Sequence, residues 1–502
     1  MQDEDSDDDS ESQDERDSSD VEECDGVTNE NFEDILTPDA HEPLYPGAKI
    51  SAKALFMDMK LCPGFYGCQK SKIRGETLNR IRVFPFKSKL DMRTTAETEY
   101  LASLAEKEKS LVDRFTDILG VKGRSVLSQI VYKYIETTSI DVMHCVFINL
   151  TKKLLTLWFG SRFSDESSSM RTFLGDFNAF LKKLRPTDQT ARLPRSLDDF
   201  MYWKASEWKN FLLVYSLPLL EKFMPKVYFD HHILLVHGIS LLSMSSVTQD
   251  MMKKARACLS EYVKRFGIIY GKEHMISNIH LLLHLADVVE QFGPLWVTSC
   301  FPFEALNGVL KGNVHGSQKP ELQIASTVSI YLNLNELRKR ISKNSEEVSL
   351  FCEKVFARNR IRRKTLEISD HTYVIGSWLN NMIIESDSNE IKKTDSSCIR
   401  YITDRRSEIA EVKQFVRASV RHSCEALGCK CTPEIYAIIS KCRVRPAFSC
   451  NVTKNSLPNF HRGDGCDELT AIKVSDISSV CYKLYVDGDM YIVEPCNNSE
   501  VE

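Results

Sequence analysis

Two histidines and a glutamate are the first candidates for chemistry in this sequence. His280 and His284 are four residues apart, which places them one turn apart on the same face of a helix. Such a pair can bind a metal ion or hold a carboxylate, although histidine on an apolar helix face is more often a core residue with satisfied hydrogen bonds. Glu304 lies in the apolar segment 301–306, where a carboxylate is costly unless it is paired or bound to a metal. These residues therefore predict either a metal site or buried, paired side chains.

Asp141 and His144 form a second group. Asp141 directly precedes an apolar helical run, and aspartate in that position commonly caps a helix N-terminus. His144 has the same two interpretations as the other histidines. A further dense group comprises His422, Cys424, Cys429 and Cys431. Its spacings match neither a zinc ribbon nor a zinc finger, so we interpret it as a cluster of structural thiols.

Several classes of protein lose their main sequence support. The chain has no Walker A loop, no Gly-x-Gly-x-x-Gly, no His-Glu-x-x-His and no Gly-x-Ser-x-Gly motif. This argues against nucleotide hydrolases, dinucleotide oxidoreductases, zinc peptidases and esterases, and we expect no small-molecule cofactor. No uncharged apolar run reaches about 18 residues and no secretory signal opens the chain, so we expect no membrane partner. The 16 irregularly spaced cysteines are typical of reduced thiols in an intracellular protein.

The elements that must position these groups are mainly helices. Apolar residues at three-to-four spacing predict helices within residues 96–119, 144–159, 170–184, 197–216, 227–242 and 248–269, and another after Pro320 that runs to Lys343. Strand patterns lie near the two ends, at residues 53–57 and in the alternating region 469–495, where residues 486–490 read as a hairpin turn. The fold class is therefore mainly α with α+β parts and a small β-rich C-terminal module.

The net charge of −5 conceals a strong asymmetry. Residues 1–34 carry 17 acidic side chains against the single Arg16, and residues 471–502 carry six against two lysines, so the segment between them has a charge of about +15. Residues 1–44 are too poor in apolar side chains to fold, and we predict a disordered acidic tail there. The basic middle favours DNA as a partner, although dispersed solvated charges would give the same sum.

One basic cluster stands out within this middle segment. As a loop it would contact DNA phosphates or serve as a nuclear-import signal, and as a helix it would be an exposed charged face. Its basic residues are Arg358, Arg360, Arg362, Arg363 and Lys364.

Four blocks of residues occur together in one order. They are Gly64-Phe-Tyr-Gly-Cys68 with Val83-Phe-Pro-Phe86; Asp141-Val-Met-His-Cys145; Leu193-Pro-Arg-Ser-Leu197 with Tyr202-Trp-Lys-Ala-Ser-Glu-Trp208; and Asn278-Ile-His-Leu-Leu-Leu-His284 with Phe301-Pro-Phe-Glu-Ala-Leu306. In this succession, over residues 47–345, the chain resembles the transposase-derived proteins of CACTA-like (En/Spm-like) DNA transposons.

The resemblance implies a partial RNase H-like core interrupted by a large helical insertion. We accordingly divide the chain into an acidic tail (1–44), a partial core segment (45–145), the helical insertion (146–275), a core-completing helical segment with Glu304 (276–345), a basic cluster with a linker (346–400) and a helical and β C-terminal module (401–502). In such a core three carboxylates gather divalent ions for phosphodiester displacement, and oxygen ligands suit Mg²⁺ or Mn²⁺.

The resemblance assigns roles to particular residues. Asp141 and Glu304 match the second and third carboxylates, which makes them the expected catalytic residues and metal ligands, with His280 and His284 as further candidate ligands. Lys49 stands where the family has its first aspartate, and Asp58 is a candidate replacement.

Two departures from the family pattern bear on function. The family's Cys-x-x-Cys pair is reduced to Cys68 and Ser71, and an acidic tail stands where the family has a longer N-terminal part, which indicates an N-terminal truncation. The first hypothesis is therefore a transposon-derived protein with nuclear DNA association and impaired catalysis. The second is an active, Mg²⁺-dependent DDE-type transposase that cleaves and transfers DNA strands. The third is a helical interaction scaffold without a nucleic-acid role, with a cytoplasmic location as the alternative; a homo-oligomer is compatible with each.

Overall fold

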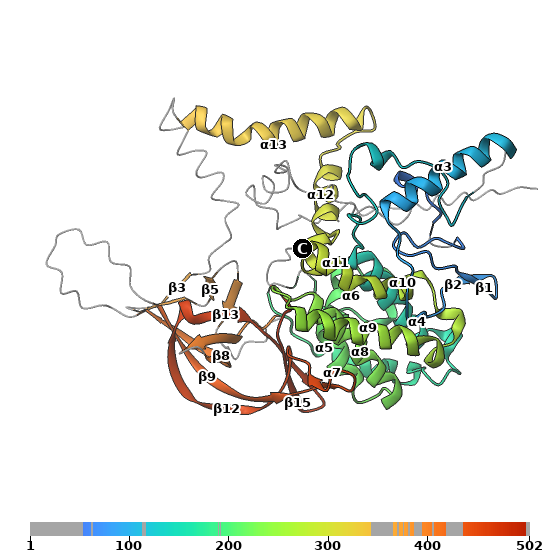
Figure 1. The fold of residues 1–502 in the computed structure, drawn as a ribbon. Coiled ribbons are helices and arrows are strands. Elements are labelled where there is room, and N and C mark those ends of the chain that lie inside the picture. The colour runs from blue at the N-terminus through green and yellow to red at the C-terminus, as the bar shows by residue number, and fades with distance from the viewer. Residues whose placement is uncertain are drawn as a thin grey trace, which may run out of the picture.

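The computed structural model describes residues 54–61, 64–112, 117–188, 190, 192–342, 365–368, 371–374, 376–379, 382–385, 394–403, 406–417 and 435–497. Within these ranges a helical body is followed by a separate antiparallel sheet (Figure 1). The expectation of a mainly helical chain with a strand-rich C-terminal module is therefore confirmed. The acidic tail, Lys49, the basic cluster at 358–364 and the thiol group at 422–431 lie outside the described residues.

The N-terminal part of the described chain holds few strands. β1 (Glu76–Leu78) and β2 (Ile81–Val83) form a two-stranded hairpin, which is followed by helix α3 (Thr95–Val112) and the 3₁₀ turn η1 (Val126–Gln129). An extended loop over residues 64–75 precedes the hairpin and brings Cys68 and Ser71 into the interior.

The prediction of a strand over residues 53–57 is wrong, because residues 54–56 are helical. Ala54 and Met57 are buried, whereas Leu55 and Phe56 between them are exposed. A three-residue spacing of the buried side chains is that of a helix face, and a strand would have buried alternate residues.

The helical body contains the segments that the three-to-four spacing predicts. Their bounds are η2 (Met143–Leu150, a π-helix), α4 (Thr151–Phe159), η3 (Ser161–Phe163), η4 (Arg171–Phe173), α5 (Leu174–Lys183), η5 (Leu197–Tyr202), α6 (Ala205–Asn210), η6 (Phe211–Tyr215), α7 (Ser216–Leu220), α8 (Lys226–Leu242), α9 (Gln249–Ile269), η7 (Lys272–His274), α10 (Ser277–Leu281), η8 (Leu282–His284), α11 (Leu285–Phe292), η9 (Leu295–Thr298), α12 (Phe301–Gly312) and α13 (Pro320–Ser342). In Figure 1, α12 leads out of the body to the long α13.

Helix α8 is the centre of the helical body. From Tyr228 to Leu242 nearly all of its residues are buried, as expected for a helix that is apolar on every side. α9 buries one face against it, including Ala255 and Leu259. The two helices approach closely at Gly238, where a Cβ atom would lie 2.8 Å from Leu259 Cγ. The absence of a side chain at this glycine therefore sets the distance between the two helices.

The C-terminal module is a seven-stranded antiparallel sheet with the strand order β13-β7-β8-β9-β12-β15-β14. Its strands are β7 (Cys398–Thr403), β8 (Arg406–Arg417), β9 (Ile435–Pro446), β12 (Phe460–Lys473), β13 (Ile477–Val480), β14 (Tyr482–Val486) and β15 (Asp489–Val493), with the 3₁₀ turn η10 (Val474–Asp476) before β13. Short hairpins are formed by β3 (Thr365–Ile368) with β4 (His371–Val374), β5 (Gly376–Leu379) with β6 (Met382–Glu385), and β10 (Ser449–Cys450) with β11 (Asn455–Ser456).

The expected hairpin turn is confirmed at the C-terminal edge of this sheet. β14 and β15 pair from Tyr482 to Val486, and the connecting Asp487 and Gly488 have φ of 53° and 89°. Positive φ at both central residues is what a tight two-residue hairpin with right-handed twist requires.

One end of the sheet packs against the helical body. Tyr215 of η6 and Tyr482 of β14 form an edge-to-face ring pair with centroids 6.4 Å apart. Glu221 accepts a hydrogen bond of 2.7 Å from Arg462 Nη2, and the hydroxyl of Tyr491 donates to the same oxygen. The apolar core of the body continues into the residues of β12, β14 and β15. The module therefore shares its core with the helices.

Replacing Gly238 with valine should destabilise the helical body. The new side chain would overlap Leu259, which is only 1% exposed and has little room to move. Overpacking of this kind costs about 1–3 kcal/mol, and urea denaturation followed by circular dichroism would measure the loss.

Gly175→Ala on α5 is the matched control, because its Cβ would meet nothing within 4 Å. It should leave the free energy of unfolding unchanged or raise it by up to about 1 kcal/mol through helix propensity. Equal losses in the two variants would contradict the close approach of α8 and α9.

Candidate functional site

Asp141 is a fully satisfied, buried carboxylate at the start of η2. Its Oδ1 accepts hydrogen bonds from the backbone N–H groups of Met143, at 3.1 Å, and Cys300, at 2.9 Å. Its Oδ2 accepts one from the backbone N–H of His144, at 3.0 Å, and a short one from the Nδ1 of the same residue. A carboxylate offers about four lone-pair positions, so protein donors occupy the acceptor capacity of Asp141. The interpretation as a helix cap is confirmed.

The same contacts fix the charge of Asp141. Burial alone would raise the pKa of its carboxyl group, but the His144 side chain and the backbone N–H groups of His144 and Cys300 outweigh that effect and hold the pKa below its ordinary value. Asp141 is therefore ionised at neutral pH. Because Cys300 lies 159 residues away in the sequence, this one anion joins the start of η2 to the start of α12.

Glu304 reaches the same imidazole from α12. Its Oε1 lies 3.2 Å from His144 Nε2, while His144 Nδ1 faces Asp141, so one histidine stands between the two acids. The expectation of a partner for Glu304 is therefore confirmed. The expectation that it is buried is wrong, because its side chain is 49% exposed. Only Phe301 of α12 is buried, and the apolar segment 301–306 lies largely at the surface.

The donors around Asp141 do not suit Mg²⁺. Within the described residues, the metal-binding atoms that gather with Asp141 are a histidine nitrogen of His144 and the Cys300 sulfur. Mg²⁺ prefers an octahedron of oxygen ligands, and the oxygens of Asp141 already accept hydrogen bonds. Asp58 belongs to no such ligand group in this part of the chain, and it has a positive φ of 45° in a turn after the first helical residues.

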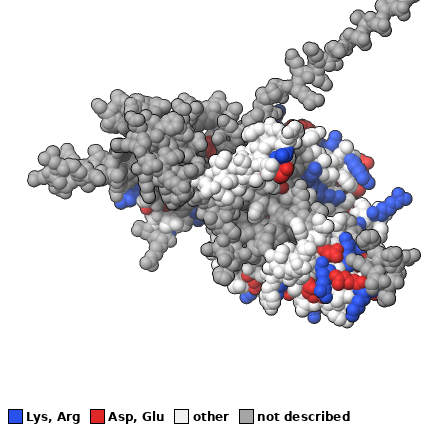
Figure 2. Space-filling model, turned by 90° about the horizontal axis from the view of Figure 1, so that it is seen from above, with Lys and Arg blue, Asp and Glu red and all other residues white. Residues whose placement is uncertain are grey.

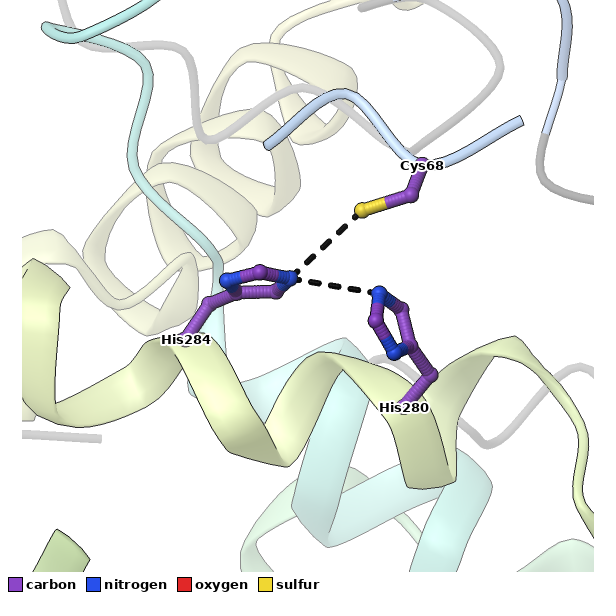
Figure 3. A group of neighbouring side chains, drawn as sticks. All are labelled: Cys68, His280 and His284. Atoms are coloured by element: carbon purple, nitrogen blue, oxygen red, sulfur yellow. Dashed lines mark hydrogen bonds between the residues drawn. The ribbon is translucent and has the colours of Figure 1, made fainter. Parts of the chain in front are cut away.

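His280 and His284 form a different cluster, with Cys68 (Figure 3). Cys68 Sγ lies 3.6 Å from His284 Nε2, and the two Nε2 atoms lie 3.2 Å apart. Ser71 closes the group, with its hydroxyl oxygen 3.1 Å from His280 Nε2 and 3.4 Å from Cys68 Sγ. All four residues are buried.

Two of these distances match the ligand separations of a tetrahedral zinc site. Zn–S bonds of about 2.3 Å and Zn–N bonds of about 2.0–2.1 Å at tetrahedral angles place sulfur and nitrogen about 3.6 Å apart and two nitrogens about 3.3 Å apart. The observed separations are 3.6 Å and 3.2 Å. Ser71 lies beside Cys68 and His280, at the position where the family that the sequence resembles has a second cysteine. The donor set of one thiolate and two imidazoles fits Zn²⁺ and does not fit Mg²⁺.

The charge of Cys68 agrees with a ligand role. Burial would raise the pKa of its thiol, but the His280 and His284 imidazoles outweigh this and hold the pKa well below its ordinary value. The thiolate is the form that binds metal. Arg93 fixes the loop that carries it, since its Nε donates to the Cys68 carbonyl oxygen at 2.9 Å.

The two groups are neighbours in the fold. Cys145, on η2 just after Asp141, places its sulfur 3.8 Å from the carbonyl oxygen of Asn278, at the start of the helical segment that carries His280 and His284. The sequence placed His280 and His284 with the acids, whereas the structure brings them to Cys68. The signal that could have found Cys68 is the remaining half of the Cys-x-x-Cys pair, read together with the His-x-x-x-His spacing.

Comparison with known proteins adds no assignment. The sequence matches no protein-family model and none of the curated proteins searched. No helix among the described residues is long and apolar enough to cross a membrane.

Ser71→Cys should convert the three-donor cluster into a closed Cys₂His₂ site. Even groups outside the ligand shell change metal affinity about 10- to 100-fold, so a fourth ligand should raise zinc affinity at least about tenfold. Competition with a zinc chelator, followed through residual bound zinc, measures the change. Ser139→Cys, at another buried serine, is the control and should leave zinc affinity unchanged. Equal affinities for wild type and Ser71→Cys would contradict the site.

Asp141→Asn should lower the free energy of unfolding by about 1.5–3 kcal/mol at pH 7, the usual contribution of hydrogen bonds to a charged group. Because the folded-state pKa of Asp141 is depressed, its stabilisation is complete above the unfolded pKa of about 4 and is lost as pH falls through the folded pKa. The difference between wild type and Asp141→Asn should therefore shrink below about pH 4.

Urea denaturation at a series of pH values measures this difference. Asp165→Asn, at an exposed aspartate, is the control and should change stability little at any pH. A difference between wild type and Asp141→Asn that stays constant down to acid pH would contradict the ionised cap.

Proposed function

We propose that this chain is a transposase-derived protein, related to the CACTA-like group, that associates with DNA in the nucleus and no longer cleaves it. Three features support the derivation. The four motif blocks occur in the family order. The two family acids meet at His144 although they are distant in sequence, and the chain between them is the helical body, as expected for a large insertion between the second and third acids.

The proposed fold is a partial RNase H-like core around the acids. β1 and β2 are the strands described before Thr365, so we propose that the remaining sheet of such a core has been lost. The antiparallel sheet of the C-terminal module is a separate addition in this proposal.

The observation that carries the loss of cleavage is the saturation of Asp141. Four protein donors surround the carboxylate that should bind the catalytic ion, and His144 stands between it and Glu304. A metal ion would have to displace these donors, and each displaced group would be left buried without a partner. Lys49, in place of the first family aspartate, adds a positive charge where a third carboxylate is needed.

DNA association is supported by charge. The segment between the acidic ends carries about +15, and it includes the basic cluster at 358–364, which lies outside the described residues. In Figure 2, Lys and Arg side chains are interspersed with Asp and Glu over the described surface of that view. The proposal therefore assigns phosphate contacts to the basic cluster rather than to a uniformly basic face.

One observation favours the second candidate, an active DDE-type transposase. Glu304 is half exposed and stands only one imidazole away from Asp141. Rotation of His144 out of this position would leave the two acids facing each other, with Mg²⁺ or Mn²⁺ as the ion between them.

Purified full-length protein should bind DNA with strong salt dependence and show no nicking with Mg²⁺ or Mn²⁺. Each phosphate contact contributes about −0.9 to the slope of log affinity against log salt concentration. Changing the five basic residues of the cluster at 358–364 to glutamine should therefore flatten the slope. The control with equal charge replaces five basic residues of α9, Lys253, Lys254, Arg256, Lys264 and Arg265.

The binding and nicking assays together separate the inactive DNA-binding protein, the active transposase and the protein scaffold. Nicking by wild type that Glu304→Gln abolishes, while Glu321→Gln on α13 preserves it, would overturn the proposal and establish the active enzyme. Neither binding nor nicking would leave a protein scaffold without a nucleic-acid role.

A further inference from the structure

We propose a second zinc site, formed by His237, Cys258 and Cys450, that fastens the C-terminal module to the helical body. The three residues come from α8, α9 and the β10–β11 hairpin. Their ligand atoms all lie within 4.8 Å of one another, and 192 residues separate the two cysteines in the sequence. The tertiary structure alone brings them together.

The sulfur–sulfur distance fits zinc thiolates better than a disulfide. Cys258 Sγ and Cys450 Sγ lie 3.6 Å apart. Two thiolates bound to one tetrahedral Zn²⁺ at about 2.3 Å lie about 3.8 Å apart, whereas the S–S bond of a disulfide is about 2.05 Å. Bringing a metal into the cluster therefore requires little movement of the two sulfur atoms.

The buried His237 imidazole is incompletely paired. The three side chains are at most 1% exposed. His237 Nδ1 has no hydrogen-bond partner among the described residues, and its Nε2 lies 3.5 Å from Thr453 Oγ1, at the limit of a hydrogen bond. Buried imidazoles are normally well paired, and a metal would satisfy this one.

The local backbone presents Cys450 and Thr453 to the helices. After β10 the chain turns sharply, with the Lys454 N–H donating to the Cys450 carbonyl oxygen at 2.9 Å and Lys454 at a φ of 57°. This turn brings the Thr453 hydroxyl toward His237, and Thr453 is only partly buried. For a metal bound through His237 Nδ1, the fourth corner of the site would be taken by a water molecule, while the Thr453 hydroxyl stays at Nε2.

Other contacts hold the β10–β11 hairpin against α8 independently of the metal. The rings of Phe229 on α8 and Phe448 before β10 lie 5.9 Å apart, and Asn451 Nδ2 donates to Asp230 at 3.3 Å. The hairpin therefore contacts α8 through these residues as well as through the proposed zinc ligands. The donor set is two thiols and one imidazole with no carboxylate, which selects Zn²⁺ over Mg²⁺ or Ca²⁺. Binding there would close a long chain segment and add its free energy to folding.

Metal analysis of the full-length protein, purified without a histidine tag after growth with zinc, tests the proposal. The wild type should contain two zinc ions per chain, one in this site and one at Cys68, His280 and His284. Cys450→Ser and Cys258→Ser should each reduce the content to one, as should Cys68→Ser, and Cys68→Ser with Cys450→Ser should reduce it to none. Cys398→Ser, at a buried thiol of β7 in the seven-stranded sheet, is the control and should retain two.

Cobalt substitution tests the second site without changing any of its ligands, and so does not depend on whether Cys258→Ser and Cys450→Ser fold. In Cys68→Ser the second site alone remains, and added Co²⁺ should give thiolate-to-cobalt charge-transfer absorption. Absence of that absorption in folded Cys68→Ser would overturn the proposal. Zinc content that Cys258→Ser and Cys450→Ser leave unchanged would overturn it as well, as would mass spectrometry showing a Cys258–Cys450 disulfide in the purified protein.

Discussion

The buried carboxylate of Asp141 is the interaction on which the arrangement of both candidate sites depends. It accepts hydrogen bonds from two residues of η2 and from the backbone of Cys300, and it pairs with His144. A buried anion is stable only when donors surround it closely. The start of η2 and the start of α12 therefore have a fixed position relative to each other. That position brings Glu304 to His144 and places η2 beside the segment that carries His280 and His284.

A carboxylate can serve structure or catalysis. Which role it has depends on how many of its acceptor positions are left free by the protein's own hydrogen-bond donors. An aspartate with free acceptor positions in a cleft can bind a metal ion. The oxygens of Asp141 instead accept hydrogen bonds from four protein donors. The thiol and imidazole groups of Cys68, His280 and His284 hydrogen-bond to one another and to Ser71, at distances that suit a tetrahedral ion. The donor types around Cys68 therefore suit Zn²⁺, whereas those around Asp141 do not suit Mg²⁺.

The sequence predicted those features that depend on local pattern. Helices from α4 to α9 follow from three-to-four spacing, the hairpin at Asp487 and Gly488 follows from its turn residues, and the cap at Asp141 follows from its place before an apolar run. It failed at residues 54–56, where a short apolar run does not distinguish helix from strand. It also predicted a buried Glu304, because an apolar segment does not show that α12 projects from the body.

The two clusters of cysteine and histidine side chains could not be predicted from the sequence, for a different reason. Cys68 and His284 are 216 residues apart, and Cys258 and Cys450 are 192 apart, so no local spacing signals either contact. Only the helical His-x-x-x-His pair indicated a ligand set, and it did so without its partner. The saturation of Asp141 likewise depends on the backbone of a residue 159 positions away.

The central claim is that Asp141 is a structural anion rather than a metal ligand. A crystal structure of the full chain soaked in Mn²⁺, with anomalous scattering used to locate the ion, tests this most directly. The account predicts no manganese at Asp141, with its hydrogen bonds to Cys300 and His144 intact. A manganese peak bound by both Asp141 and Glu304, with His144 displaced, would contradict it.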